Sequence, residues 1–358
     1  MKDNKDNTTR KPVVITMGDP AGIGPETIVK AFHEAPDLLR GCFVAGDVAT
    51  MRRAVGFVCN PSNPAQLPWP IAQIGAPKAV VDVPPRCIPV MQVAQKHALV
   101  PMGKINASAG RVAGDCVLWA ARAALTGEVG ALVTAPLHKE SLAAAGLPYS
   151  HYPGHTELLQ AEAAAHAGCT VREMPVRMML ANNELRTVLV SIHMSLRAAI
   201  DAVTVESVLQ TVRITHKSLR SMLGRAPRIA VAGLNPHAGE GGLFGEEELM
   251  VIQPALEVAR AEGIDVHGPF APDTVFMRGR ATNGVMREFD VVVAMYHDQG
   301  LIPVKYLGVE QGVNVTLGLP LVRTSPDHGT AFDIAGQGIA DPSSLLAAIR
   351  MARQLQAL

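Results

Sequence analysis

The chain has 358 residues. A single hydrophobic core rarely supports a chain of this length, so two domains are expected. Hydrophobic residues make up 48% of it and aromatic residues only 4%, which favours helices packed on a buried sheet over an aromatic-rich sandwich. Basic and acidic residues number 32 each, so no net charge would attract nucleic acid or an anionic membrane. Any anion site must therefore be local.

The N-terminal sequence MKDNKDNTTRKP has no apolar region typical of a signal peptide, and no run approaches the 18 apolar residues of a membrane span. The five cysteines are an odd number, and no two have the spacing of a metal motif. Buried thiols in a reducing compartment are the simplest interpretation. These features predict a soluble, cytoplasmic protein with a flexible tail over residues 1–12.

Short β-branched runs alternate with longer helical patterns along the chain. The runs cover residues 13–17, 42–47, 131–136, 187–192, 228–234 and 291–295, and most are followed by a turn rich in Gly, Pro or Asn. This alternation predicts an α/β fold with βαβ units and a largely parallel sheet. Boundaries between two lobes are expected near residues 146–154 and in the segment after Lys305.

Three histidines follow predicted strands. His193 comes directly after one run, His237 lies three residues past another, and His297 ends the stretch VVVAMYHDQG beside Asp298. Ligands of open α/β sheets bind outside the carboxyl ends of the strands, so polar groups there are informative. Three imidazoles that leave a fourth position open suit a catalytic Zn²⁺ or another divalent ion. Such a metal serves a hydrolase as well as an alcohol dehydrogenase, and the histidines alone do not decide between them.

Two further segments could bind an anion. In YPGHTELLQAEAAAHAG, residues 154–156 stand at the start of a predicted helix, with Thr156 as its N-cap, and the free backbone N–H groups there favour phosphate or carboxylate. Lys305, Asn314 and Arg323 place polar donors within an otherwise apolar stretch. The glycine-rich MGDPAGIGPE is neither a G-x-G-x-x-G nor a Walker A motif, so a standard Rossmann site is not predicted.

Eight motifs in order resemble the 4-hydroxythreonine-4-phosphate dehydrogenase family of pyridoxal phosphate biosynthesis and its paralogues. They are MGDPAGIGPE, TAPLHKE, GHTELL, GLNPHAGEGGLFGEEE, APDT, MYHDQG, GVNVTLGLP and RTSPDHGTAFDIAG. The resemblance as a whole extends from about residue 13 to the C-terminus. The resemblance implies the two-lobed fold of isocitrate and isopropylmalate dehydrogenases, with the active site in the cleft between the lobes. It implies a cofactor-side lobe of residues 13–145 plus 308–358, and a metal, substrate and dimerisation lobe of residues 146–307.

The resemblance also implies roles for individual residues. His193, His237 and His297 match the family's divalent-metal ligands, for which zinc is expected, with magnesium or cobalt as alternatives. The substrate contacts implied are His155, Thr156, Lys305, Asn314 and Arg323. The segment HGTAFDIAG resembles an adenosine-binding loop, which implies that His328, Gly329, Thr330 and Asp333 bind NAD or NADP. A homodimer that shares its metal site between subunits is implied as well.

The implied reaction is oxidation of a secondary alcohol by NAD or NADP, followed by loss of CO₂ from the resulting β-keto acid. Asp298 and Lys139 are the candidate general bases, and either could instead support a neighbouring group. The resemblance implies a small, anionic substrate. It is 4-phosphooxy-L-threonine in the vitamin B6 enzyme; in paralogues it is 4-phosphorylated threonate or erythronate, or an aromatic cis-dihydrodiol such as that of terephthalate. A metal-dependent hydrolase and a non-enzymatic binding protein are the competing interpretations.

Overall fold

The computed structural model describes residues 11–59, 67–95, 98–281, 287–308 and 311–356, so most of the predicted N-terminal tail lies outside the described residues. The chain divides into two compact units. Unit 1 comprises residues up to 174 together with 319–357, and unit 2 comprises residues 175–318. Both boundaries lie later in the sequence than the predicted positions near 145 and 307. The first does so because helix α6 (His155–Ala167) packs against α4 (Ala107–Leu125) and so belongs to unit 1.

Unit 1 contains six strands of a parallel sheet in the order β3-β4-β2-β1-β5-β12. In chain order they are β1 (Val13–Thr16), β2 (Cys42–Gly46), β3 (Ile71–Ile74), β4 (Ile88–Gln92), β5 (Ala131–Thr134) and β12 (Arg323–Pro326). The central strands β1, β2 and β5 are buried along their whole length, as expected for a parallel sheet with both faces covered.

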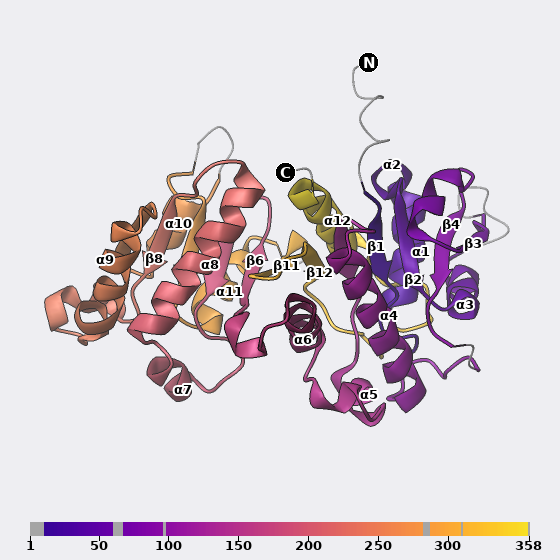
Figure 1. Cartoon of the computed structure of the whole chain (residues 1–358), viewed down its shortest axis with the longest axis horizontal. Helices are drawn as coiled ribbons and strands as arrows, with labels where there is room; N and C mark the ends of the chain where they lie inside the picture. Colours follow the sequence, from indigo (N-terminus) through magenta and orange to yellow (C-terminus); the bar gives the residue numbers. More distant parts are fainter. Residues whose placement is uncertain (1–10, 60–66, 96–97, 282–286, 309–310, 357–358) are drawn as a thin grey trace, which may run out of the picture. The chain divides into compact units, whose positions relative to one another are not determined.

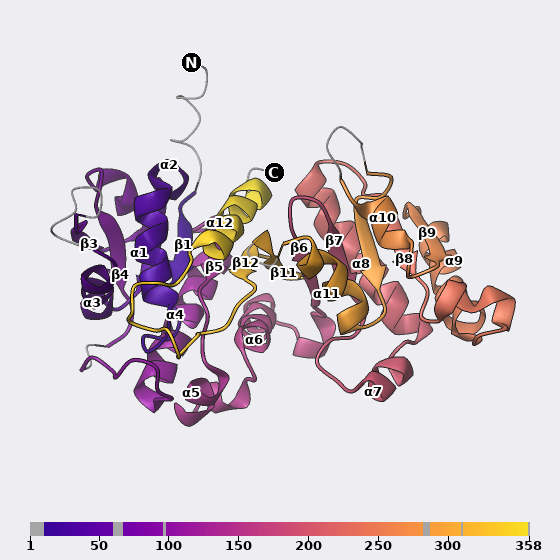
Figure 2. The ribbon, with the colours of Figure 1, turned by 180° about the vertical axis from the view of Figure 1, so that it is seen from behind.

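Helices cover both faces of this sheet. Figure 1 shows α4 in front of the strands, and Figure 2 shows α1 in front of them from the opposite side. Besides α4 and α6, the helices are α1 (Gly24–Glu34), α2 (Pro36–Leu39), α3 (Val48–Val58), α5 (Lys139–Ala144) and α12 (Ser343–Gln356). The core beneath α4 and α6 joins Val14, Phe43 and Leu132 of the strands to Val117 and Leu158 of these helices. Burial of such apolar surface is the main stabilising contribution to this unit.

Unit 2 has a mixed sheet in the order β11-β6-β7-β10-β8-β9. The strands are β6 (Arg177–Ala181), β7 (Arg186–Leu189), β8 (Ile229–Ala232), β9 (Val266–Phe270), β10 (Val291–Ala294) and β11 (Val313–Leu317). Strands β7, β10, β8 and β9 are parallel, whereas β6 is antiparallel to both of its neighbours. Three adjacent parallel strands, β7, β10 and β8, therefore end at one common edge.

The helices of unit 2 also lie on two faces. Figure 1 shows α8 in front of the sheet, and Figure 2, which views the chain from the opposite side, shows α11 in front of it. The helices are α7 (Leu196–Asp201), α8 (Val205–Leu223), α9 (Gln253–Ala261), α10 (Val275–Gly279) and α11 (His297–Tyr306). The core on the α11 face contains Leu189, Val292, Phe289, Leu301 and Val304.

The six predicted strand runs all contain strands, and the predicted α/β class with largely parallel strands is confirmed. β-branched content and the turn residues that follow identified them because these strands are short and almost entirely buried. Within the described part of the chain, no helix combines the length and the apolar character needed to cross a membrane.

Candidate functional site

A buried cation lies in unit 1 beside the end of β5. Arg323, the first residue of β12, is only 4% exposed, and its Nε and Nη2 donate to Thr134 Oγ1 over 3.1 and 2.7 Å. Burial lowers the pKa of Arg323 to about 10, and the nearby carboxylate of Glu157 opposes this decrease. Arg323 is still charged at neutral pH, so unit 1 contains a positive charge that is poorly hydrated.

Helix α6 begins next to this cation. Its N-cap is Gly154, in extended conformation and without a side-chain cap, and His155 is its first residue. The prediction that Thr156 caps this helix is therefore wrong, because the helix begins before that residue. A side chain at position 154 would lie 3.8 Å from Lys139 Cε, so Lys139 reaches the same helix start.

The pKa of His155 lies well below its ordinary value. Burial is the main cause, the positive charges of Arg323 and Lys139 add to it, and a hydrogen bond to the backbone of Ala135 opposes it. The buried Nε2 has no hydrogen-bond partner among the described residues. His155 is thus a neutral imidazole with one nitrogen available, beside Arg323 and the free N–H groups of a 13-residue helix. This arrangement suits a phosphate or carboxylate.

Buried polar atoms without a partner gather at the carboxyl ends of the unit 1 strands. Among the described residues they include Thr16 Oγ1, Asp19 Oδ2, His138 Nδ1, His155 Nε2 and His328 Nε2. Buried polar groups in proteins are normally paired with protein groups or ordered water. Their concentration at this edge of the sheet indicates where a ligand binds, as expected for an open α/β sheet.

The loop predicted to bind the cofactor follows β12 at this edge. Thr330 is buried and its carbonyl accepts from Ile23 N over 3.0 Å, whereas Asp333 is exposed. A side chain at Gly329 would meet no atom within 4 Å, so there is open space beside this backbone. The unpaired Nε2 of His328 is a further binding group. These features fit a nicotinamide dinucleotide, although the roles of the four residues stay predictions.

Further contacts fix this loop to the rest of unit 1. Phe332 stacks on His138 with ring centroids 4.6 Å apart and planes at 13°. The buried carboxylate of Glu26 in α1 accepts from the backbone N–H groups of Gly336, Gly338 and Ala340 over 3.0 to 3.4 Å. The loop therefore has a defined position before any ligand binds.

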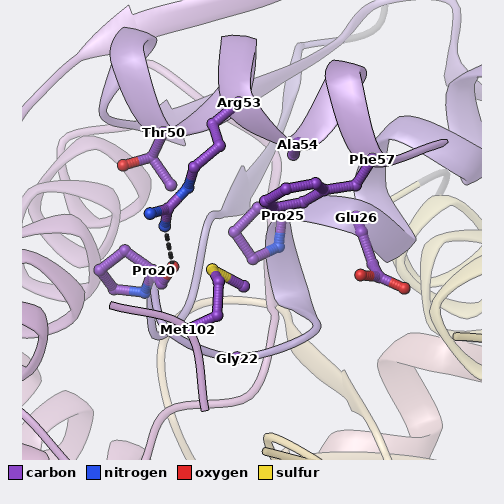
Figure 3. A pocket seen from close by; sticks show the side chains of 9 residues that line it. All are labelled: Pro20, Gly22, Pro25, Glu26, Thr50, Arg53, Ala54, Phe57 and Met102. Carbon is purple, nitrogen blue, oxygen red and sulfur yellow. Dashed lines mark hydrogen bonds between the residues drawn. The ribbon is translucent and has the colours of Figure 1, made fainter. Parts of the chain in front are cut away.

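Figure 3 shows a hollow beside the same loop, between α1 and α3. Its polar lining groups already have partners: Arg53 donates to the carbonyls of Pro20 and Val100, and Glu26 accepts the three N–H groups described above. The remaining lining residues are mostly apolar or backbone, including Phe57 and Met102. The hollow supports the adjacent loops and lacks free groups for chemistry.

In unit 2, two of the predicted metal ligands lie together. His193 follows β7, His297 begins α11 after β10, and their ring centroids are 5.7 Å apart. The Nδ1 of His297 lies 2.7 Å from Asp298 Oδ1, so this carboxylate holds the ring orientation and leaves Nε2 for a metal. The exposed His193 and the half-buried His297, at the carboxyl ends of two adjacent parallel strands, suit a pair of metal ligands.

His237 lies in an unusual loop after β8. Residues 237–241 all have positive φ, between 45° and 79°, and three of the five are not glycine. Such a backbone is strained and is found where function requires it. The buried Glu248 stabilises the approach to the loop by accepting from the N–H groups of Leu234 and Asn235, each over 2.7 Å. The His237 side chain is 63% exposed and touches Glu240 at 3.2 Å.

His237 does not join the other two histidines to form a complete site. Within the described part of one chain, no three His, Cys, Asp or Glu side chains are grouped so that they could hold a metal ion. One chain therefore does not by itself fit the predicted three-histidine site, and the set of ligands stays a prediction.

The predicted substrate contacts divide between the units. His155, Thr156 and Arg323 belong to unit 1, and the first and last of these lie close together. Lys305, in the last turn of α11, and Asn314, in β11, are half-buried residues of unit 2. Of the two candidate bases, Lys139 belongs to unit 1 and Asp298 to unit 2.

The sequence interpretation missed several residues that build these sites. Thr134 holds Arg323, Glu26 holds the predicted cofactor loop, and Glu248 holds the loop of His237. Each lies inside a motif that was recognised: Thr134 opens TAPLHKE, Glu26 ends MGDPAGIGPE, and Glu248 ends GEEE. For Glu26 and Glu248, the available signal was an acidic residue within a glycine-rich motif, because a buried carboxylate can accept hydrogen bonds from several backbone N–H groups at once.

The comparisons with known proteins agree with this geometry. The family described as "Pyridoxal phosphate biosynthetic protein PdxA" matches residues 39–352. The chain belongs to this family. The predicted resemblance is therefore confirmed, and the family's dehydrogenase relatives support a nicotinamide cofactor.

Individual relatives cover almost the whole chain. A protein of Beijerinckia indica named 4-hydroxythreonine-4-phosphate dehydrogenase is 48% identical over 96% of this chain and 95% of its own length. A protein of Salmonella typhimurium named D-threonate 4-phosphate dehydrogenase is 44% identical over 96% of this chain and 99% of its own. The crystal structure of 4-hydroxythreonine-4-phosphate dehydrogenase from Klebsiella pneumoniae, 39% identical, covers 97% of this chain and 99% of that chain with a TM-score of 0.82.

Proposed function

We propose that the chain oxidises the secondary alcohol of 4-phosphooxy-L-threonine with NAD or NADP, and that the β-keto acid formed then loses CO₂. Family membership supports the dehydrogenase reaction. The observation that carries the choice of an anionic substrate is the buried Arg323 beside His155 and the start of α6.

In this proposal the phosphate of the substrate binds in unit 1. Arg323 supplies a fixed positive charge that Thr134 orients, and the first N–H groups of α6 supply donors. His155, neutral in the free protein, accepts a proton or a hydrogen bond at Nε2 when the anion arrives. Thr156, Lys305 and Asn314 are proposed as further substrate contacts.

The bound cofactor supplies the acceptor for the hydride that leaves the carbinol carbon. The hydroxyl proton must go to a base, and we assign this role to Lys139, which lies beside Gly154 at the substrate's proposed position. Asp298 is assigned to orientation, because its Oδ1 is already engaged by His297 Nδ1. His328, Gly329, Thr330 and Asp333 are proposed to hold the dinucleotide.

Loss of CO₂ follows from the chemistry of the oxidised product. The carbonyl lies β to the carboxylate, so the electron pair of the breaking carbon–carbon bond passes to the carbonyl oxygen and forms an enolate. A proton from the protonated base or from solvent then completes the product. Cationic groups near that oxygen would stabilise its developing charge.

We further propose a homodimer in which His193, His237 and His297 bind a divalent metal, zinc or alternatively magnesium or cobalt, with ligands from both subunits. The pair formed by His193 and His297 and the separate position of His237 support a site that one chain leaves incomplete. A cytoplasmic location is proposed as well, in keeping with five cysteines that are all free.

The D-threonate 4-phosphate activity is the second candidate, because the Salmonella typhimurium relative with that name is 44% identical. The two substrates share the phosphate and the secondary alcohol, so the unit 1 site serves either one. The difference lies at the carbon that carries an amino group in one and a hydroxyl in the other.

The test is formation of reduced cofactor, followed by absorbance, with purified protein, Zn²⁺ or Mg²⁺, and NAD or NADP. The substrates are 4-phosphooxy-L-threonine, 4-phospho-D-threonate, 4-phospho-D-erythronate and the cis-dihydrodiol of terephthalate. The highest kcat/KM with the amino compound supports the proposal, whereas preference for a sugar acid supports the second candidate. Absence of cofactor reduction with all four, together with cofactor-free ester hydrolysis, would favour a hydrolase and overturn both.

A further inference from the structure

A cluster of arginines lies at the amino ends of three strands in unit 2. Arg186 begins β7, Arg228 directly precedes β8, and Asp290 directly precedes β10, which lies between the other two strands. Arg225 and Arg287 also contact this group through side chain or backbone. We call Arg186, Arg225, Arg228, Arg287 and Asp290 the arginine cluster.

The carboxylate of Asp290 pairs with two members of this cluster, Arg225 and Arg228. Asp290, only 4% exposed, accepts from Arg225 Nη1 and Nη2 over 2.8 and 2.7 Å and from the backbone N–H of Arg228 over 2.8 Å. Among the described residues, Arg186 Nη1 donates to the backbone carbonyl of Asp290 over 3.3 Å. The neighbouring Glu288 is bound by Nε and Nη2 of Arg278, and the charge of Arg228 also contributes to lowering its pKa.

Two of the guanidinium groups retain buried donors. Arg186 Nε and Arg287 Nη1 are buried and have no hydrogen-bond partner among the described residues. Burial and the charges of Arg287 and Arg225, against the opposing effect of Asp290, together lower the pKa of Arg186 to about 10. Four arginines and one aspartate leave an excess of about three positive charges at the amino ends of these strands, which favours an anion there.

We propose that the arginine cluster binds a phosphate group, either as free phosphate or as part of a larger phosphorylated metabolite. A guanidinium presents its N–H donors in a planar fork that matches phosphate oxygens, and two adjacent forks match a dianion. The unpaired Nε of Arg186 and Nη1 of Arg287 are the donors for this ligand.

This site is separate from the one proposed for catalysis. Strands β7, β10 and β8 place the arginine cluster at their amino ends, whereas His193, His297 and His237 follow their carboxyl ends. Each strand has four residues, so the two ends are about 10 Å or more apart at ~3.3 Å per residue. Phosphate here would act on the same strands that carry the metal histidines without occupying the substrate site.

The test counts phosphate ions bound per chain by equilibrium dialysis of the full-length protein at fixed ionic strength. The variants are Arg287→Gln and Arg186→Gln for the cluster, and Arg323→Gln for the substrate site. Arg213→Gln is the matched control, because Arg213 forms an exposed pair with Glu262 in the same unit. Two phosphates are expected for the native protein and for Arg213→Gln, and one for each of the other three.

A parallel measurement of Tm separates binding from a structural role. In chloride, Arg287→Gln should leave Tm unchanged or raise it, because the substitution removes repulsion. Phosphate should raise the Tm of the native protein by about 3 °C, and Arg287→Gln should lose part of this rise. Pyrophosphate binding more tightly than phosphate at the cluster would indicate that a diphosphate of a larger metabolite is the ligand.

Each outcome decides the matter. Two phosphates in Arg287→Gln, or a single native phosphate that disappears in Arg323→Gln, would overturn the inference. A single native phosphate that persists in Arg323→Gln and disappears in Arg287→Gln would support it while contradicting the proposed substrate site. Should Arg186→Gln fail to fold, the half-buried Arg287 alone provides the test.

Discussion

At the carboxyl ends of the strands, the two units differ in how firmly their polar groups are held in place before a ligand binds. In unit 1, Arg323 and His155 are held by Thr134 and the Ala135 backbone, in surroundings that exclude most water. In unit 2, His193 and His237 are exposed, and the strained loop of His237 rather than burial fixes its position. A buried charge is ready for a ligand within one chain, whereas exposed imidazoles need a metal and further ligands to become a site.

The largest expected effect comes from removing one of the proposed metal ligands in unit 2. His237→Ala should lower kcat/KM by about 10³-fold or more if the metal is essential, yet change the stability of the folded protein by less than ~0.5 kcal/mol because the side chain is exposed. Steady-state kinetics and thermal unfolding measure the two effects. His267→Ala is the control, since His267 is an exposed histidine of the same unit, paired with Asp265.

Full activity after complete metal removal with a chelator would contradict the metal proposal. Under the proposal, activity is lost on chelation and returns when Zn²⁺ or Mg²⁺ is added to the native protein. The same addition should not restore His237→Ala.

The proposed anion site of unit 1 is tested by Arg323→Gln. Removing this cation should reduce kcat/KM for a phosphorylated substrate by roughly 10²- to 10³-fold, because a desolvated partner of an anion contributes about 3 to 4 kcal/mol. Arg323→Lys keeps the positive charge but loses the planar set of guanidinium donors, so its kcat/KM should lie between those of the native protein and Arg323→Gln. Arg122→Gln, which removes an exposed pair with Glu162, is the matched control in unit 1. An equal loss with the dephosphorylated substrate would contradict phosphate binding by Arg323.

A third comparison separates the two candidate bases. Asp298→Asn should weaken metal binding by about 10- to 100-fold, so that excess metal restores turnover, because the carboxylate orients His297. Lys139→Met should lower kcat by about 10²-fold or more at any metal concentration. Glu140→Gln, at the exposed neighbour of Lys139, serves as the control. The reverse pattern would exchange the two assignments.

The sequence predicted much of this fold, because fully buried strands such as Val291–Ala294 have an unmistakable apolar, β-branched composition. It also placed His193, His237 and His297 after strands, since position after a strand is a local property. Features that depend on long-range packing could not be derived from local sequence patterns. The unit boundary at residue 174 depends on α6 packing against α4, and the role of Thr134 depends on Arg323, which lies 189 residues later.

The smallest expected effect concerns pH and His155. Its folded-state pKa lies well below the ordinary value, so the unfolded chain takes up a proton near pH 6.5 that the folded chain does not. Stability should therefore fall as pH decreases below about 6.5, with a slope below ~1.4 kcal/mol per pH unit from this group, until the folded-state pKa is reached. Urea unfolding at about pH 7.5 and 5.5 measures the difference.

His155→Gln should reduce this pH dependence, whereas His151→Gln, at an exposed neighbouring position, should retain it. Phosphate should also reduce it in the native protein, because a bound anion beside Arg323 and His155 raises the pKa of the imidazole and lets the folded state take up the proton. The arginine cluster has no histidine, so phosphate bound there leaves this pH dependence unchanged. A pH dependence that phosphate does not alter would thus show that the anion binds away from His155. This result would contradict the proposed phosphate site of unit 1.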